Sequence, residues 1–203
     1  YHRWDAVLAD VDLDHWDEAT AIQELIRRYV KSYGPVTLDD MSWWTGMTKR
    51  LCREALEVLS DAVEAVAVAD WPGPLYTAAD AVVDPPPMAS VAALALIDAF
   101  VLGYRDRARL LDAARQGFVY DGGGNSAATL VWQGRIIGVW QTVENPEPAV
   151  WYHRFAEAPS ALREEAEVEL AAAGCLYFDR PVDVVEVPEM EPLGARGGRS
   201  AMH

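Results

Sequence analysis

The sequence predicts an α+β protein in which a helix-rich domain precedes a strand-rich domain. Residues 22–33 place apolar side chains at helical spacing, and residues 127–140 hold two strand-like runs around a Gln-Gly turn. Between them, residues 84–88 contain three consecutive prolines, which make a stiff linker that cannot enter a regular ladder. A chain of 203 residues with 51% hydrophobic content can bury a substantial core.

The first domain, residues 18–83, is predicted to start with three helices. Asp17 and Gly34-Pro35 bound the first, whose apolar stripe consists of Ile22, Leu25, Ile26, Tyr29, Val30 and Tyr33. Thr37 caps a short second helix that ends at Gly46, with Asp40 as the acid of a capping box. Thr48 caps the third helix, whose expected buried stripe is Cys52, Ala55, Leu56 and Leu59.

The short turn between the second and third helices is typical of a helix-turn-helix. Extended runs at residues 63–68 and 75–77 follow, separated by a turn at residues 70–74, and complete a winged helix-turn-helix domain. In such a domain Lys49, Arg50 and Arg53 would face DNA. Because Glu54 and Glu57 share the exposed face, a winged helix that serves only as a packing module remains the alternative.

The second domain, residues 89–190, is predicted to be a small β-barrel-like domain with one helix. Its expected helix covers residues 159–174, and its expected strands are residues 91–97, 117–120, 127–132, 135–140, 149–155 and 182–187. Residues 191–203 form an expected flexible tail, disordered from Gly194 onward. Residues 1–17 show no periodic element, and we expect them to be the end of a missing preceding domain or the remainder of a processed leader.

Residues 98–112 concentrate positive charge in an otherwise acidic chain. If this segment is a strand, Arg105, Arg107 and Arg109 share one face; if it is a helix, only Arg105 and Arg109 do. These arginines could pair with nearby aspartates on a structural surface, or they could form an anion-binding face, because guanidinium groups match phosphate oxygens. The residues alone leave both interpretations open.

Composition restricts the partners and cofactors. A net charge of -15 argues against a protein that coats nucleic acid, although residues 27–60 hold six basic residues against four acids. No histidine lies at ligand spacing and no phosphate-binding or nucleophile-elbow motif occurs, so we expect no metal and no cofactor.

Cys52 and Cys175 are expected to be buried thiols in helices, which fits a cytoplasmic protein. No apolar run is long enough to span a membrane, which needs about 20 residues.

Three separated runs carry a resemblance to a known family. They are residues 29–47 (YVKSYGPVTLDDMSWWTGM), 98–112 (DAFVLGYRDRARLLD) and 130–140 (LVWQGRIIGVW). In this order they resemble the winged-helix DNA-binding family whose characterised members are DNA glycosylases that unhook alkylation damage and interstrand crosslinks. The resemblance covers residues 18–190. It implies that the chain corresponds to the last winged helix and the C-terminal β-barrel of such a protein, with damaged double-stranded DNA as its partner.

The catalytic signature of that family, Gln-x-Gln or Gln-x-Asp, has no match here. Gln23, Gln116, Gln133 and Gln141 are followed two residues later by Leu25, Phe118, Arg135 and Val143. No catalytic residue is therefore assigned, and the resemblance implies that base excision would need a part of the protein outside this chain.

The expected DNA contacts and one alternative function complete the predictions. The expected contacts are Arg105, Arg107, Arg109, Gln133 and Arg135, ahead of Lys49, Arg50 and Arg53. The alternative is a non-catalytic winged-helix regulator or interaction module that binds a protein through its acidic surface.

Overall fold

The computed structural model describes residues 11–12, 15–69, 71–81 and 90–196. The chain divides into two compact units, Tyr1–Val83 and Asp84–His203, each of which we describe by itself. The predicted linker at residues 84–88 lies outside the described residues, as do most of the predicted N-terminal segment and the last seven residues of the predicted tail.

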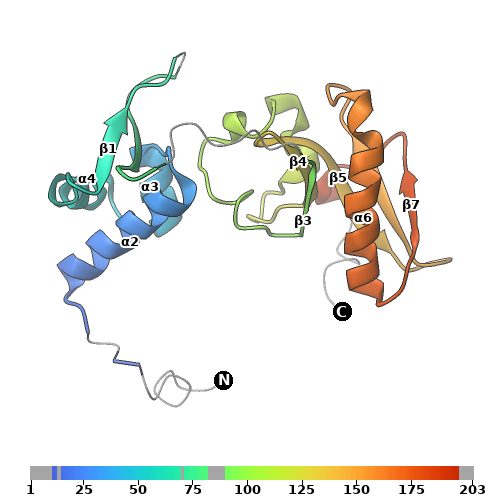
Figure 1. Ribbon diagram of the computed structural model, residues 1–203, viewed down its shortest axis with the longest axis horizontal. Helices are drawn as coiled ribbons and strands as arrows, with labels where there is room; N and C mark the ends of the chain where they lie inside the picture. The colour runs from blue at the N-terminus through green and yellow to red at the C-terminus, as the bar shows by residue number, and fades with distance from the viewer. Residues whose placement is uncertain (1–10, 13–14, 70, 82–89, 197–203) are drawn as a thin grey trace. The chain divides into compact units, whose positions relative to one another are not determined.

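Within residues 11–12, 15–69 and 71–81, the first unit holds three helices and a two-stranded sheet (Figure 1). Its elements are α2 (Glu18–Tyr33), α3 (Leu38–Thr45), α4 (Lys49–Val58), β1 (Val63–Val66) and β2 (Leu75–Ala78). The three predicted helix starts are confirmed: Asp17, Thr37 and Thr48 each accept a hydrogen bond from a first-turn amide. Strands β1 and β2 pair antiparallel, with Val63 opposite Ala78.

The core of the first unit is built from the inward faces of the helices. Its buried apolar residues include Ile26, Tyr29, Val30, Val36, Met41, Cys52, Ala55 and Leu56. The backbone of Val36 bridges that of Tyr76, which ties the turn before α3 to β2. Leu25, predicted to belong to the buried stripe of α2, is instead 39% exposed, because it lies at the edge of that stripe.

The second unit is a five-stranded sheet with α6 (Arg163–Phe178) packed on it (Figure 1). The strand order is β3 (Ala92–Leu94), β4 (Ala128–Trp132), β5 (Arg135–Val143), β6 (Ala149–Arg154) and β7 (Asp183–Glu186). The β4–β5 hairpin is confirmed, with Gln133 and Gly134 at φ 49° and 75° in its turn. Leu162, Ala166 and Leu170 pack with buried sheet residues such as Leu130, Val150 and Tyr152.

The predicted barrel-like sheet does not close into a barrel: among the described residues it is open, with β3 and β7 as its edges. Strand β7 pairs with β6 in parallel, and α6 connects the two. Parallel neighbours need a long crossover, so the helix that the sequence revealed completes a β-α-β unit and not a barrel wall. Strand β7 is therefore an edge strand of an open sheet.

Other predictions for the second unit also need correction. Residues 117–120 are not a strand but lie largely in the short helix α5 (Gln116–Val119), which continues a 3-10 turn at Ala113–Arg115. The strand expected at residues 91–97 is limited to β3, because Ile97 has φ 58° and breaks the extended run. Cys175 is exposed on α6, although Cys52 is buried as predicted.

The chain after β7 is ordered beyond the start of the expected tail. Residues Leu193–Ala195 form a 3-10 turn, and Arg196 donates to the carbonyl oxygens of Glu191 and Phe118 over 2.6 and 3.3 Å. Arg196 thereby holds this segment against α5. Burial lowers the pKa of its guanidinium.

Candidate nucleic-acid interface

The arginine-rich segment is a chain of turns stabilised by its own aspartates. Asp98 accepts a hydrogen bond from the amide of Phe100 over 2.8 Å, and Asp106 accepts one from the amide of Ala108 over 2.9 Å. The second bond opens the 3-10 turn Arg107–Arg109. Neither the strand nor the helix considered for this segment forms, because these carboxylates offer the backbone amides a local alternative.

Two of the arginines in this segment lie over tyrosine rings. The guanidinium carbon of Arg107 is 3.6 Å from the ring centroid of Tyr120, and that of Arg109 is 4.3 Å from the ring centroid of Tyr104. Both rings are largely buried, so they form fixed platforms. Cation–π stacking orients the guanidinium plane of each arginine. Both arginines are half-buried, and Nε of Arg109 is buried. Arg105, between the two tyrosines in sequence, is exposed.

Tyr120 is itself held from within the unit. Its hydroxyl donates to the carbonyl oxygen of Val101 over 3.0 Å. Burial raises the pKa of Tyr120 to about 12, although the positive charge of Arg107 opposes the shift. The phenol therefore stays neutral at physiological pH, and it supports Arg107 as a ring and not as an anion.

The hairpin tip between β4 and β5 is bound to the same segment. Arg135 donates through Nη1 to the carbonyl oxygen of Ala108 over 3.1 Å and through Nη2 to Oδ1 of Asp112 over 2.9 Å. The amide of Ile136 donates to the carbonyl oxygen of Leu110 over 2.8 Å. The structure thus brings Arg107, Arg109 and Arg135 together, although they come from two separate segments of the sequence. Gln133 is exposed at the tip.

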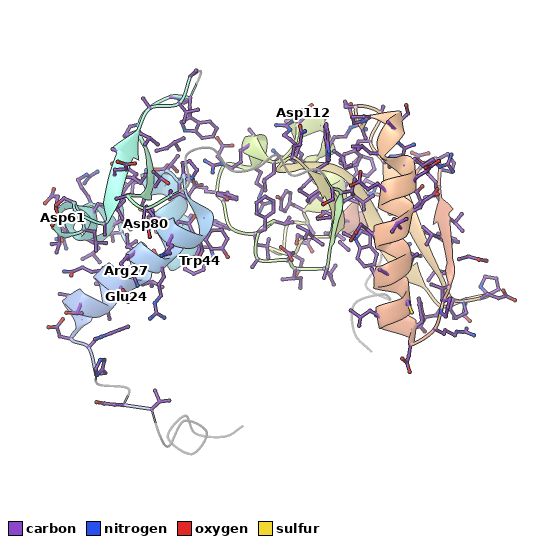
Figure 2. All side chains as sticks on the ribbon, viewed as in Figure 1. Glu24, Arg27, Trp44, Asp61, Asp80 and Asp112 are labelled. Atoms are coloured by element: carbon purple, nitrogen blue, oxygen red, sulfur yellow. The ribbon has the colours of Figure 1, made fainter. Side chains whose placement is uncertain are left out.

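A pocket of about 210 Å³ adjoins this junction. Two ion pairs lie in its wall, Arg135 with Asp112 and Arg115 with Glu157, the second over 2.8 Å. Trp132, Ile137 and Phe155 supply apolar wall, and Asp112 is labelled in Figure 2. Because each arginine of the pocket already has a carboxylate partner, the pocket is close to charge-neutral.

The basic residues predicted on the first unit are mostly paired. Lys49 forms an ion pair with Asp39, and Arg50 with Glu54 over 2.6 Å. Arg53 is exposed and has no ion-pair partner among the residues that the structure describes. On this helix the acids neutralise most of the positive charge that the sequence placed there.

The first unit has its own hollow of about 220 Å³, lined by Arg27, Lys31, Asp61 and Asp80 among others. Glu24 and Arg27 lie together along α2 (Figure 2), where Arg27 and Arg28 both bond to that carboxylate and lower the pKa of Glu24 to about 2. Lys31 pairs with Asp80 over 3.3 Å. This hollow therefore offers no concentrated charge of one sign.

Across the described ranges, no group of three His, Cys, Asp or Glu side chains is arranged to hold a metal ion. Nor does any helix in that part of the chain have the length and apolarity needed to cross a membrane.

The sequence did not reveal the residues that support the candidate arginines. Tyr104, Tyr120 and Asp112 contact arginines at separations that follow no helical or strand period. The one local signal was the adjacency of Tyr104 to Arg105, which does not identify Arg109 as the arginine on that ring. The sequence predicts a strand at Tyr120 and indicates no partner for its ring.

Residues 1–178 match the model of a family described as AlkZ-like DNA glycosylase. Among solved structures, the fold is similar to that of the Streptomyces sahachiroi DNA glycosylase AlkZ, with a TM-score of 0.72 and 20% identity. The match covers 85% of this chain and 47% of that protein, so the chain spans about half of its length. No curated protein sequence matches.

Proposed function

The chain belongs to the AlkZ-like DNA glycosylase family, and from this premise we propose that it is a DNA-binding portion of a DNA-repair, crosslink-unhooking glycosylase-like protein. Its partner in this proposal is damaged double-stranded DNA. We assign it no catalytic residue, because none of its glutamines begins a Gln-x-Gln or Gln-x-Asp pair. Its task is to hold the strand, and phosphate contacts do that without reading sequence.

We interpret the first unit as a winged helix. Helices α3 and α4 with their short turn supply the helix-turn-helix, and β1 and β2 supply the wing. In this interpretation Arg53 is the basic residue of α4 that is best available to DNA, since Lys49 and Arg50 are paired with carboxylates.

The observation that carries the proposal is the pair of tyrosine-supported arginines beside the hairpin tip. A guanidinium that is already oriented loses less conformational entropy when it binds a phosphate. Arg107 and Arg109 are supported in this way, and Arg105 and Gln133 extend the same region with exposed side chains. We therefore assign the phosphate contacts to this region first.

The test is the affinity of the 203-residue chain for a labelled DNA duplex at several salt concentrations. Each phosphate contact contributes a slope of roughly -0.9 to the dependence of log K on log salt concentration. Arg107→Ala should therefore weaken binding and reduce the steepness of that dependence by about one unit. Arg180→Ala, which removes an equal charge from an exposed position after α6, is the matched control and should change little.

A protein-binding function is the second candidate, and specific observations favour it. Trp43 and Trp44 are 43% and 40% exposed on α3, and the whole chain carries a net charge of -15. Exposed aromatic side chains are enriched in protein interfaces. Absence of duplex binding even at low salt, or binding that added salt leaves unchanged, would favour this candidate and reject DNA binding.

A further inference from the structure

We propose that Arg135 is a positioning residue, which fixes the turn that carries Arg107 and Arg109 and does not itself bind phosphate. This inference rests on the proposed DNA-binding function, but it changes the role of a residue that charge alone would place among the DNA contacts. Its basis is the identity of the acceptors to which the Arg135 guanidinium donates hydrogen bonds.

Both terminal nitrogens of Arg135 donate to the arginine segment. Nη1 reaches the carbonyl oxygen of Ala108 and Nη2 reaches Asp112, over 3.1 and 2.9 Å. These two acceptors lie on either side of the end of the 3-10 turn, so the planar fork spans it. A phosphate bound in bidentate fashion would need the same fork, and it would also meet the carboxylate of Asp112.

The bond to Ala108 acts directly on the candidate phosphate contacts. Ala108 is the central residue of the turn, between Arg107 and Arg109, so its carbonyl sets the orientation of the peptide that joins them. The amide of Ile136 also donates to the carbonyl oxygen of Leu110, which fixes the peptide between Leu110 and Leu111. Tyr104 and Tyr120 orient the two guanidinium groups, and Arg135 holds the backbone from which they extend.

The first experiment uses Asp112→Ala in the full chain, because the two roles predict opposite signs. If Arg135 binds phosphate, removing Asp112 frees it and also removes a negative charge, so duplex affinity should rise. If Arg135 positions the turn, the fork loses one of its two anchors, and affinity should fall by about two- to fivefold in spite of the more favourable charge. A rise in affinity would overturn the proposal.

The second experiment compares Arg135→Lys and Arg135→Ala. A lysine keeps the positive charge but cannot reproduce the fork. We expect both variants to lose about fivefold or more in affinity, and we expect Arg135→Ala to have no further effect in an Arg107→Ala/Arg109→Ala background measured at low salt. Retained affinity in Arg135→Lys, or an equal loss in both backgrounds, would show a direct contact.

The third measurement needs no DNA and separates this proposal from the DNA function. The amides of Leu110 and Leu111 donate to the carbonyl oxygen of Arg107 and close the turn. In Arg135→Ala the hydrogen exchange of these two amides should accelerate by about tenfold. The amide of Val187, which follows β7 and donates to the carbonyl oxygen of Tyr152, should exchange at an unchanged rate. Faster exchange without any duplex binding would reject the DNA function alone; unchanged exchange would reject the positioning role alone.

Discussion

At the scale of single residues, Tyr120 gives a prediction in pH. Its pKa rises from 10.0 to about 12 through burial, so the folded protein keeps a neutral phenol at a pH at which the unfolded chain ionises it. The stability that this contributes is fully present below pH 10 and is lost as the pH rises from 10 to 12, by roughly 2 kcal/mol.

The comparison of wild type with Tyr120→Phe measures that loss. At pH 7 the variant should be less stable by about 1 kcal/mol, because the carbonyl of Val101 loses its hydrogen bond. Near pH 12 the order should reverse, since phenylalanine has no proton to release. Urea unfolding at several pH values gives the curve, and Tyr177→Phe, on an exposed ring, should follow the wild type. A constant difference from pH 7 to 12 would contradict the prediction.

A second prediction at this scale concerns Asp40, a fully buried carboxylate. It accepts hydrogen bonds from the amide and the hydroxyl of Thr37 over 2.9 and 2.8 Å, and so completes the capping box of α3. Asp40→Ala should lower the free energy of unfolding of the first unit by about 2 kcal/mol, because a part-buried amide is left without its acceptor.

Asp39→Ala provides the control for Asp40. Asp39 precedes it on α3, and its carboxylate is 45% exposed and pairs with Lys49 at the surface. Pairs of this kind contribute about 0–1 kcal/mol, so this variant should lose much less stability in urea. Equal losses in the two variants would show that helix charge, and not the buried cap, stabilises α3.

At the scale of elements, Gly138 lies closely against the backbone of the neighbouring strand. A Cβ at this position of β5 would lie 2.6 Å from the carbonyl oxygen of His153 and 3.2 Å from the Cα of Arg154, both on β6. Backbone atoms of a paired strand cannot move aside as the end of a flexible side chain can. Gly138→Ala should therefore destabilise the second unit by roughly 2–3 kcal/mol in thermal or urea unfolding.

Gly122→Ala is the matched substitution for Gly138. Gly122 lies in the loop before β4, and a Cβ there would meet no atom within 4 Å. We expect its effect to stay within about 0.5 kcal/mol. If Gly138→Ala were as mild, the β5 and β6 backbones would have to lie farther apart than the structure shows.

Elements set by local chemistry were predictable from the sequence. The caps Asp17, Thr37 and Thr48 act within three residues, and the Gln133-Gly134 turn joins strands that are adjacent in sequence. The open sheet was not predictable in this way. A barrel and an open sheet use similar strands, and the difference lies in whether β7 pairs with β6 or closes on β3.

The candidate site was predictable only in part for the same reason. Charge and spacing identified Arg105, Arg107 and Arg109, but their faces could not be derived, because Asp98 and Asp106 replace regular structure with turns. The contacts of Arg135 with Ala108 and Asp112 cross 27 and 23 residues and follow no period. Such long-range pairs emerge only when the hairpin and the turn fold against each other.

At the scale of the whole molecule, the negative net charge contrasts with the surroundings of individual arginines. The chain carries 32 acidic and 17 basic residues, and many of the bases in both units are neutralised by carboxylates. Arg107 and Arg109 in addition lie over tyrosine rings, which carry no charge. The net charge alone therefore does not describe the surroundings of each arginine.

The two units also differ in their cysteines, and this permits a test of their independence. Cys52 is fully buried on α4 in the first unit, and burial raises the pKa of its thiol; Cys175 is exposed on α6 in the second. The thiolate is the reactive form, so a thiol-reactive dye should label Cys175 quickly in the native protein and Cys52 only when the first unit opens.

Asp40→Ala should speed the slow labelling of Cys52 by roughly tenfold or more, in line with its loss of stability. Gly138→Ala should leave the slow reaction unchanged if each unit opens on its own. Acceleration of Cys52 labelling by Gly138→Ala would instead show that the two cores unfold as one cooperative structure.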